Sequence, residues 1–330
     1  MAVASLASCG SASSTPQIID VSGDIRVHDP ALVVSPGDEP WYVYSTGDVK
    51  VGFGAPQIRR STDHGQTWQL VGTAWTAAGD PQWVRESIDG VQNYWAPELY
   101  AHDGQWYLYY AASTFGSNKS AIGLATSVSL DPDDSDFGWV DQGQVIASTP
   151  GVDNFNAIDP AVISDEDGSG WMFFGSFWGG IFVVPLTWPS GMVTQGAVPM
   201  KVASRVGTPN NPIEAADVIR HDQWYYLFVS WDYCCQGADS TYRVMVGRSA
   251  TVTGPYVDAE GKAMLDGGGT PVLWTDGSMI GPGGASASGD HIGFHYYDGD
   301  DGGQFRLAIH TLVWTEDGWP TGMVSSGESG

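Results

Sequence analysis

The sequence has few basic residues and no long apolar run. In 330 residues, 13 Lys and Arg stand against 38 Asp and Glu, which gives a formal net charge of -25. Such a field repels phosphate backbones, which argues against nucleic acid as a partner and favours a role in solvating the surface. No apolar stretch is long enough to cross a bilayer, and none shows a convincing helical spacing. We therefore expect neither a membrane span nor a helical protein.

Cysteine is also scarce, with three residues in the chain. Cys234 and Cys235 are adjacent, and neighbouring α-carbons lie only about 3.8 Å apart, which is too close for an ordinary disulfide. The pair is either a strained vicinal disulfide or two packed thiols, and this geometry favours the thiols. No Cys/His spacing typical of a metal site occurs.

The third cysteine, Cys9, follows Leu6-Ala7-Ser8 in a pattern that resembles the lipobox of bacterial lipoproteins. The segment before it is short and lacks a basic region, so it would be a truncated signal. We interpret residues 1–19 as leader and linker, and residues 20–330 as a single domain. The prediction is a secreted protein, with lipid anchoring through Cys9 as a further option.

Glycine and tryptophan are abundant, at 44 and 15 residues. Short aromatic strands between Gly-rich turns are typical of β structure. One unit recurs: a short apolar strand, in most copies with an acid at its start, is followed about ten residues later by an aromatic strand. The strand starts are His28-Asp29-Pro30, Trp95-Ala96-Pro97-Glu98, Ile158-Asp159-Pro160, Ile213-Glu214-Ala215 and the weaker Gly281-Pro282-Gly283-Gly284. The aromatic strands begin at Trp41, Trp106, Trp171, Trp224 and Ile292.

Five such units predict an all-β fold, a five-bladed β-propeller, whose innermost strands begin near a central channel. A long strand over residues 305–314 is expected to close the ring. The string from Ser61 to Trp68 matches the Asp box, a hairpin turn common in propellers of glycan-processing proteins. We expect it to be structural, with Asp63 closing the turn and Trp68 packed beneath.

Three acids, Asp29, Asp159 and Glu214, begin strands of different blades and should converge on one face. Converging carboxylates suit a hard-cation site or glycoside hydrolysis, which needs an acid and a base on either side of the scissile bond. The neighbouring residues favour a sugar, although aromatics at strand ends are equally typical of blade packing. The candidates for stacking on a sugar are Trp95, Phe115, Phe177 and Trp178, and those for hydrogen bonding to hydroxyls are His28, Asn156 and Ser176. Glu98 lies one position further along its strand, and we interpret it as structural.

Over roughly residues 25–320 the chain resembles glycoside hydrolase family 43 and, within it, the endo-1,5-α-L-arabinanases. The motifs that carry this resemblance are Val27-His28-Asp29-Pro30, Trp95-Ala96-Pro97-Glu98, Ser113-Thr114-Phe115-Gly116, Asn156-Ala157-Ile158-Asp159-Pro160, Gly175-Ser176-Phe177-Trp178, Ile213-Glu214-Ala215 and Asp232-Tyr233-Cys234-Cys235. The His-Asp-Pro motif alone is weak. The Asn-Ala-Ile-Asp-Pro motif, together with Ser-Phe-Trp and the paired cysteines, is specific to the arabinanases.

The resemblance implies an inverting hydrolase that cleaves arabinan. By this resemblance Asp29 matches the general base, Glu214 the general acid, and Asp159 the acid that orients Glu214 and tunes its pKa. The positions that match residues lining the substrate groove are Gly116, Asn156, Ala157, Ile158, Ser176, Phe177 and Trp178. His295 matches a histidine that faces a metal ion, usually calcium, in the channel. A packed core histidine is the alternative that His295 alone would favour.

One departure affects substrate preference. Many relatives have Gly-Pro-Gly-His-Asn-Ser where this chain has Gly281-Pro282-Gly283-Gly284-Ala285-Ser286.

The partners expected are arabinan and arabino-oligosaccharides, bound by a monomer. The alternatives are an exo-acting arabinanase, a xylan-directed enzyme of the same family, and a non-catalytic glycan-binding propeller, which has no need of three carboxylates from three blades.

Overall fold

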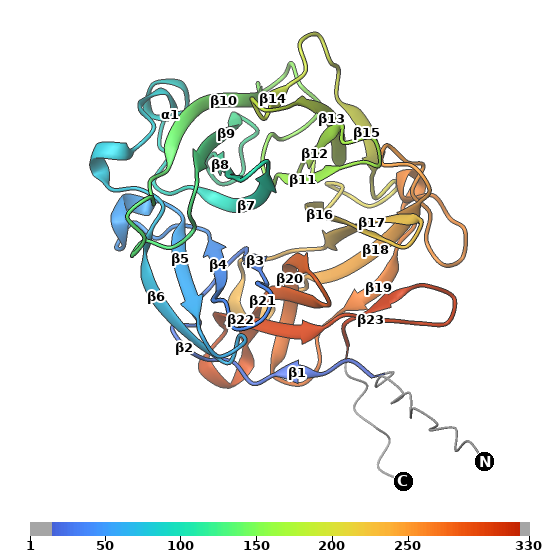
Figure 1. Ribbon diagram of the computed structural model, residues 1–330. Coiled ribbons are helices and arrows are strands. Elements are labelled where there is room, and N and C mark those ends of the chain that lie inside the picture. Colours follow the sequence, from blue (N-terminus) through green and yellow to red (C-terminus); the bar gives the residue numbers. More distant parts are fainter. Residues whose placement is uncertain (1–14, 324–330) are drawn as a thin grey trace, which may run out of the picture.

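The computed structural model describes residues 15–323 and is an all-β, five-bladed propeller (Figure 1). This confirms the predicted fold class. Cys9 and the lipobox pattern lie outside the described residues. No helix in the described part of the chain is both long and apolar enough to span a membrane.

The strands of each blade follow one another from the channel outward, and most pairs are antiparallel. Blade 1 contains β3 (Ala31–Val33), β4 (Trp41–Ser45), β5 (Gln57–Ser61), β6 (Thr67–Thr73) and the short parallel strand β2 (Ser22–Gly23). Blade 2 contains β7 (Trp95–His102), β8 (Gln105–Ala112), β9 (Ser120–Ser127) and β10 (Val140–Ser148). Blade 3 contains β11 (Ala161–Ser164), β12 (Gly170–Phe174), β13 (Ile181–Thr187), β14 (Met192–Val193) and β15 (Met200–Ala203). Blade 4 contains β16 (Ile213–His221), β17 (Trp224–Trp231), β18 (Arg243–Ser249) and β19 (Thr270–Leu273). Blade 5 contains β20 (Met279–Ser288), β21 (His291–Asp298), β22 (Gln304–Thr311) and β1 (Ile18–Ile19).

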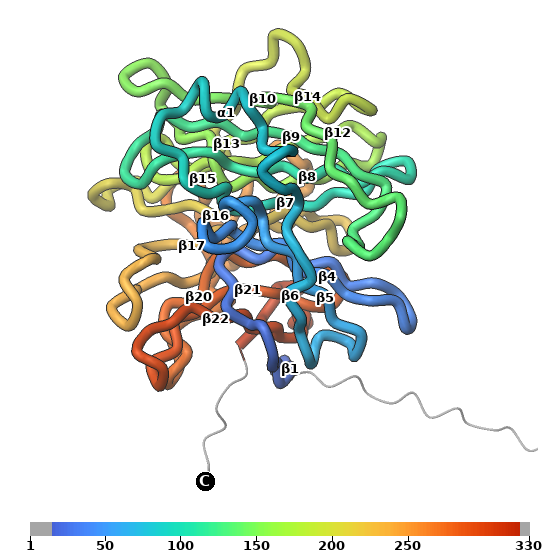
Figure 2. The backbone as a smooth tube through the Cα atoms, turned by 90° about the vertical axis from the view of Figure 1, so that its left-hand side faces the viewer, coloured from blue at the N-terminus to red at the C-terminus, as the bar shows by residue number. Residues whose placement is uncertain are grey.

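The ring is closed by strands from both ends of the chain. Strand β1 pairs antiparallel with β22, so that Ile19 lies opposite Ile309, at the bottom of Figure 2. The predicted linker to residue 19 was therefore too long, because Ile18 and Ile19 supply the outermost strand of blade 5. The predicted closing strand over 305–314 takes part as β22 but ends at Thr311, and β23 (Val313–Trp314) turns away to pair with β24 (Pro320–Thr321).

The core consists of five apolar clusters, one between each pair of neighbouring blades. Because successive residues of a strand point to opposite faces, a central strand feeds two clusters. In β8, Leu108 and Tyr110 pack toward blade 1, whereas Tyr107 and Tyr109 pack toward blade 3. Burial on both faces explains why these strands are apolar almost throughout, as in other sheets covered on both sides.

Two local features bear on the sequence predictions. In the described residues the only α-helix is α1 (Gln82–Ser87), between blades 1 and 2, and its six residues are too few to show a helical repeat. The Asp box has the expected structural role: Asp63 Oδ1 accepts the Thr67 N–H at 2.8 Å. Beneath it, Trp68 is 1% exposed and donates from Nε1 to Gly65 O.

Candidate active site

Each blade has a residue with a left-handed backbone at its innermost strand, just before β3 and β11 and within β7, β16 and β20. The five residues are Asp29 (φ 50°), Ala96 (φ 39°), Asp159 (φ 56°), Ala215 (φ 50°) and Gly284 (φ 58°). This conformation is costly for residues other than glycine, and asparagine and aspartate tolerate it better than most. Its recurrence in all five blades shows that the fold requires this turn at the channel. The turn thus places Asp29 and Asp159 at equivalent positions.

Glu214 precedes the left-handed position by one residue, which corrects the expectation that the three acids begin their strands equivalently. Glu98 and Asp217 follow the left-handed position by two residues. Glu98 Oε1 accepts the Val162 N–H, and Asp217 Oδ2 accepts the Ala287 N–H, each at 2.9 Å. Each bond joins one blade to the next, so the structural role expected for Glu98 is confirmed.

Asp29 is held as a carboxylate by its neighbours. Its Oδ2 accepts hydrogen bonds from Thr46 Oγ1 at 2.6 Å and from His28 Nδ1 at 2.8 Å. Burial raises the pKa of Asp29, but the interactions with His28, His295 and Thr46 together lower it by more, so that the pKa lies well below its usual value. The second oxygen, Oδ1, lies 3.6 Å from His295 Nδ1 and faces the space left by the missing side chain of Gly284.

Glu214 has the opposite electrostatic environment. It is buried, and burial raises its pKa, as does the nearby charge of Asp29, while hydrogen bonds from Ser176 and Tyr242 lower it. Burial and the charge of Glu214 also raise the pKa of Asp159 well above its usual value. Two buried carboxyls that repel each other favour a state in which at least one keeps its proton. Asp159 Oδ2 also accepts the N–H of Ala215, which connects it to the residue after Glu214.

The predicted substrate-binding residues fall into an exposed and a buried set. Phe115 is 83% exposed and Trp178 is 39% exposed, which leaves both rings free to stack on a ligand. Gly116 and Phe177 have left-handed backbones in the same loops as these two residues. Trp95 is half-buried and donates from Nε1 to Asn93 Oδ1.

The Asn156–Asp159 stretch is largely buried. Asn156 and Ala157 are buried, and their bonds go to Ser120 and Ser148. Ile158 is 6% exposed. The Asn156 side chain and the Ala157 backbone N–H thus hold the segment before Asp159 in place, and the burial of Asn156, Ala157 and Ile158 does not favour their direct contact with a sugar.

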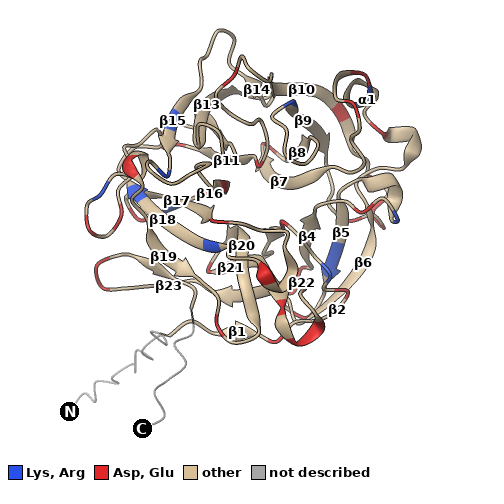
Figure 3. Cartoon of the chain, turned by 180° about the vertical axis from the view of Figure 1, so that it is seen from behind, with Lys and Arg blue, Asp and Glu red and all other residues tan. Residues whose placement is uncertain are grey.

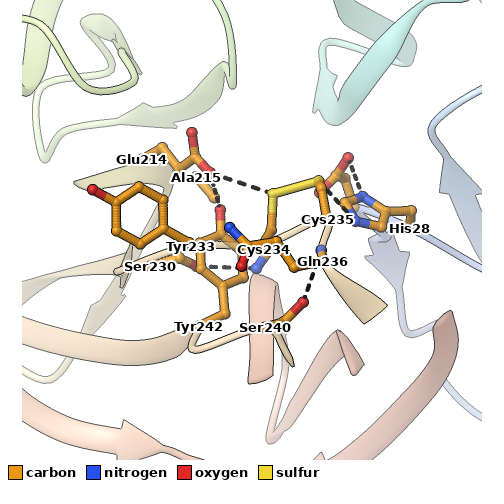
Figure 4. The surroundings of a disulfide bond; sticks show 12 residues. His28, Glu214, Ala215, Ser230, Tyr233, Cys234, Cys235, Gln236, Ser240 and Tyr242 are labelled. Atoms are coloured by element: carbon orange, nitrogen blue, oxygen red, sulfur yellow. Dashed lines mark hydrogen bonds and ion pairs between the residues drawn. A yellow bond between two sulfur atoms is a disulfide. The ribbon is translucent and has the colours of Figure 1, made fainter. Parts of the chain in front are cut away.

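Cys234 and Cys235 form a vicinal disulfide, with α-carbons 3.8 Å apart, which corrects the preference for two thiols (Figure 4). The left-handed backbone of Cys235 (φ 67°) turns the chain at this point, a conformation that the sequence did not indicate. Cys234 Sγ lies 3.8 Å from Glu214 Oε1, and Cys235 Sγ lies 3.8 Å from His28 Nε2. The disulfide thus contacts Glu214 at one end and, at the other, His28, which is bonded to Asp29.

His295 is fully buried, and its Nε2 has no hydrogen-bond partner among the described residues. Its Nδ1 accepts the N–H of Asp29 at 3.1 Å. In a neutral imidazole the other nitrogen then carries the hydrogen and has no lone pair for a metal. Calcium also prefers oxygen ligands. Ligand atoms of His28, Asp29 and His295 lie within 4.8 Å of one another, but with Nδ1 accepting the Asp29 N–H the protonated Nε2 of His295 does not fit a cation, and its N–H suits a water molecule.

Three residues that sequence reasoning missed complete the site: Thr46, Tyr242 and Tyr297. Tyr242 donates to Glu214 Oε1 at 2.5 Å, and Tyr297 Oη lies 2.9 Å from His28 Nε2. The sequence around these three residues gives no distinctive signal, and Tyr297 is 269 positions from His28. Only the assembled propeller identifies them.

Comparisons with known proteins show which family the chain resembles. The family model of glycosyl hydrolases family 43 matches residues 23–320. An extracellular exo-α-(1→5)-L-arabinofuranosidase of Cellvibrio japonicus is 38% identical over 314 residues, which cover 90% of this chain and 86% of that protein. An extracellular endo-α-(1→5)-L-arabinanase of Bacillus subtilis is 39% identical over 298 residues, covering 89% and 87%.

Among solved structures, the α-L-arabinanase of Cellvibrio cellulosa in complex with arabinohexaose superposes with a TM-score of 0.80 at 37% identity. The match covers 89% of this chain and 94% of that one. The family match from residue 23 to residue 320 spans residues of all five blades and the positions of the three acids. The chain therefore belongs to family 43 of the glycosyl hydrolases.

Proposed function

We propose that this protein hydrolyses internal α-1,5-L-arabinofuranosidic bonds of arabinan with inversion at the anomeric carbon. The observation that carries the proposal is the pair Asp29 and Glu214, whose surroundings shift their pKa values in opposite directions. An inverting glycosidase needs one carboxylate and one carboxylic acid at the same pH, so the shifts have the sign that these roles require.

Asp29 is the general base of this proposal. Its Oδ2 already accepts two hydrogen bonds, from Thr46 and His28, so Oδ1 is the oxygen left to bind a water and take its proton. The water oxygen forms a bond to the anomeric carbon while the glycosidic bond breaks on the opposite side of the sugar ring. Gly284 leaves room beside Oδ1, where a Cβ would lie 2.9 Å from that oxygen.

Glu214 is the general acid and gives its proton to the leaving oxygen. Burial keeps Glu214 protonated at a higher pH than a solvated glutamate, and the neighbouring Asp159 opposes its ionisation. The N–H of Ala215 that Asp159 accepts fixes the two acids relative to each other. Exposed Phe115 and Trp178 offer faces on which the furanose rings can stack.

Incubation with debranched arabinan, followed by chromatography of the products, tests the function. Short oligosaccharides from the earliest times support internal cleavage. Release of one small product supports exo action, as the name of the Cellvibrio japonicus relative describes. Proton NMR of the first product should show the β-anomer before mutarotation, and initial α-anomer would rule out inversion. Absence of cleavage together with binding of arabinan would favour a glycan-binding propeller.

The remaining expectations concern location, assembly and metal. Both curated relatives described above are named extracellular, which supports export of this chain with its native leader. Lipid anchoring through Cys9 and the monomeric state stay predictions, to be checked by cell fractionation and by light scattering. A calcium ion in the channel is what the family resemblance implies, whereas the hydrogen bond at His295 Nδ1 argues against its direct coordination there, and metal removal distinguishes the two.

A further inference from the structure

Tyr242 lies between blade 4 and blade 5 and is 3% exposed. Its hydroxyl donates to Oε1 of Glu214 at 2.5 Å (Figure 4). Its ring packs against the backbone of β20, where a Cβ built on Gly283 would lie 2.0 Å from a ring carbon. The carboxyl of Glu214 on blade 4 and the backbone at Gly283 on blade 5 thus hold the phenol in place.

The direction of this hydrogen bond is determined by chemistry. Burial and the charges of neighbouring acids raise the pKa of Tyr242 well above its usual value, so that the phenol keeps its hydrogen. A buried O–H needs an acceptor, and Glu214 Oε1 is its hydrogen-bond partner in the described structure. Oε1 is therefore occupied as an acceptor.

The other oxygen of Glu214 meets a different partner. Oε2 lies 2.6 Å from Ser176 Oγ, on a side chain that is 3% exposed. A serine hydroxyl can donate or accept, so it can bond to Oε2 whether this oxygen carries a proton or a charge.

We propose that Tyr242 is a positioning residue of the reaction, which reserves Glu214 Oε2 as the atom that carries and delivers the proton. The proposal rests on the function proposed above. Before the reaction Oε2–H donates to Ser176 Oγ or to the glycosidic oxygen. As the glycosidic bond breaks, the proton passes to the leaving oxygen, and Ser176 then donates to the anionic Oε2. Meanwhile Asp29 Oδ1 takes the proton lost by the attacking water.

The Tyr242 hydroxyl also lowers the pKa of Glu214, because it stabilises the ionised carboxylate. The titratable groups that interact with Glu214 are Asp159, Asp29, His28, Tyr297 and Tyr242. A change of Tyr242 to phenylalanine leaves the other four in place. Its effect on the titration of Glu214 can therefore be measured against a constant background.

The test is the pH dependence of kcat/KM for Tyr242→Phe on arabinan. Loss of a donor to a charged group should raise the pKa of Glu214 and move the basic limb of the profile up by about one pH unit. Because Oε1 is then no longer occupied by the Tyr242 hydroxyl and can carry the proton in place of Oε2, kcat at the optimum should fall about tenfold with little change in KM. An aryl arabino-oligosaccharide with an acidic phenol should recover most of this loss.

Tyr109→Phe is the matched control, since Tyr109 is also fully buried but donates to a backbone carbonyl, Gly191 O. It should lower stability without moving the limb. Gly283→Ala crowds the Tyr242 ring and keeps its hydroxyl, so it should move the basic limb of the pH profile in the same direction as Tyr242→Phe, by a smaller amount. This variant replaces Tyr242→Phe in the test if Tyr242→Phe does not fold. A basic limb that stays in place or moves to lower pH in both variants overturns the proposal. Full activity of Glu214→Gln would instead overturn the proposed function itself.

Discussion

At the scale of single residues, the roles of Asp29 and Glu214 are separable by the leaving group. Sugar hydroxyls are poor leaving groups, so Glu214→Gln should lower kcat/KM on arabinan by about 10²–10⁴-fold. Much of this loss should disappear on an aryl arabino-oligosaccharide with an acidic phenol. Asp29→Asn should lower kcat/KM by the same factor on both substrates, because water must be activated in either case. The measurement is the ratio of the two losses for each variant.

Asp159→Asn should lie between these extremes and should shift the pH profile, because it removes a carboxyl that opposes the ionisation of Glu214. Rescue of Asp29→Asn, and not of Glu214→Gln, by the good leaving group would reverse the assigned roles. Full activity of both variants would place the catalytic residues elsewhere.

Asp217 makes the fold sensitive to pH. Burial raises its pKa to about 7, whereas in the unfolded chain it ionises near its usual value of about 4. The folded state therefore binds more protons between these values, and stability from this group falls as the pH rises from about 4 to about 7. Asp217→Asn keeps an oxygen for the Ala287 N–H and should stabilise the protein at pH 8 by about 1–3 kcal/mol. Melting curves at pH 4 and pH 8 check this.

Asp63→Asn is the comparison of opposite sign. Hydrogen bonds from Thr67 and Ser61 lower the pKa of Asp63 to about 2, so its contribution is present above about pH 4 and is lost as the pH falls toward 2. This variant should lower Tm at pH 8. An Asp217→Asn variant that is less stable than the wild type at pH 8 would show that the carboxyl is not destabilising.

Removal of metal ions tests whether His295 faces a water molecule or a metal ion. With Nδ1 bonded to the Asp29 N–H, Nε2 is a donor, and verified removal of metal ions by a chelator should leave Tm and activity unchanged. The same chelator saturated with calcium beforehand provides the control for damage by the chelator. A fall in Tm that added calcium restores would instead require the other tautomer of His295 and would support the family expectation.

At the scale of elements, strand β1 contributes to ring closure through one of its two side chains. Ile19 packs against the cluster between blades 5 and 1, whereas Ile18 is 62% exposed. Ile19→Asp buries a charge beside Ile309 and should destabilise the protein by about 1–3 kcal/mol. Ile18→Asp, one residue away on the same strand, is the matched control and should change Tm little. Equal Tm values for the two variants would argue that β1 does not stabilise the ring.

The same clusters explain which strands the sequence predicted well. Strands such as β8 and β17 are buried on both faces, so they are continuous aromatic and apolar runs that stand out in any composition. The short outer strands β2 and β14 bury little and have no such signal. Prediction therefore succeeded near the middle of each blade and failed at its edge.

At the scale of the whole molecule, the charge of -25 opposes the compact state. Acidic residues occur on all five blades, as Figure 3 shows, and basic residues are few. Salt shortens the range of their repulsion to about 3 Å at 1 M. Tm should therefore rise when NaCl is increased from low concentration to about 1 M. Sucrose of equal osmolarity, which does not screen charge, is the control, and an equal rise in both would refute the electrostatic cause.

The repeated unit, the propeller and the presence of an acid near the start of the innermost strand in three blades followed from the sequence alone. These features depend on local order: a turn, a short strand, and an aromatic strand that recur at similar spacing. The family motifs lie within single turns, so they too are visible without the fold.

The contacts that give each acid its character depend on the tertiary structure. Asp29 contacts His295, which is 266 positions away in the sequence, and Glu214 of blade 4 contacts Ser176 of blade 3. The offset of Glu214 by one residue, the vicinal disulfide and the bond from Tyr242 likewise depend on how the blades are placed around the channel. A side chain's pKa follows from burial and from the neighbours within a few ångströms, and for these residues the chain supplies those neighbours only after the ring has closed.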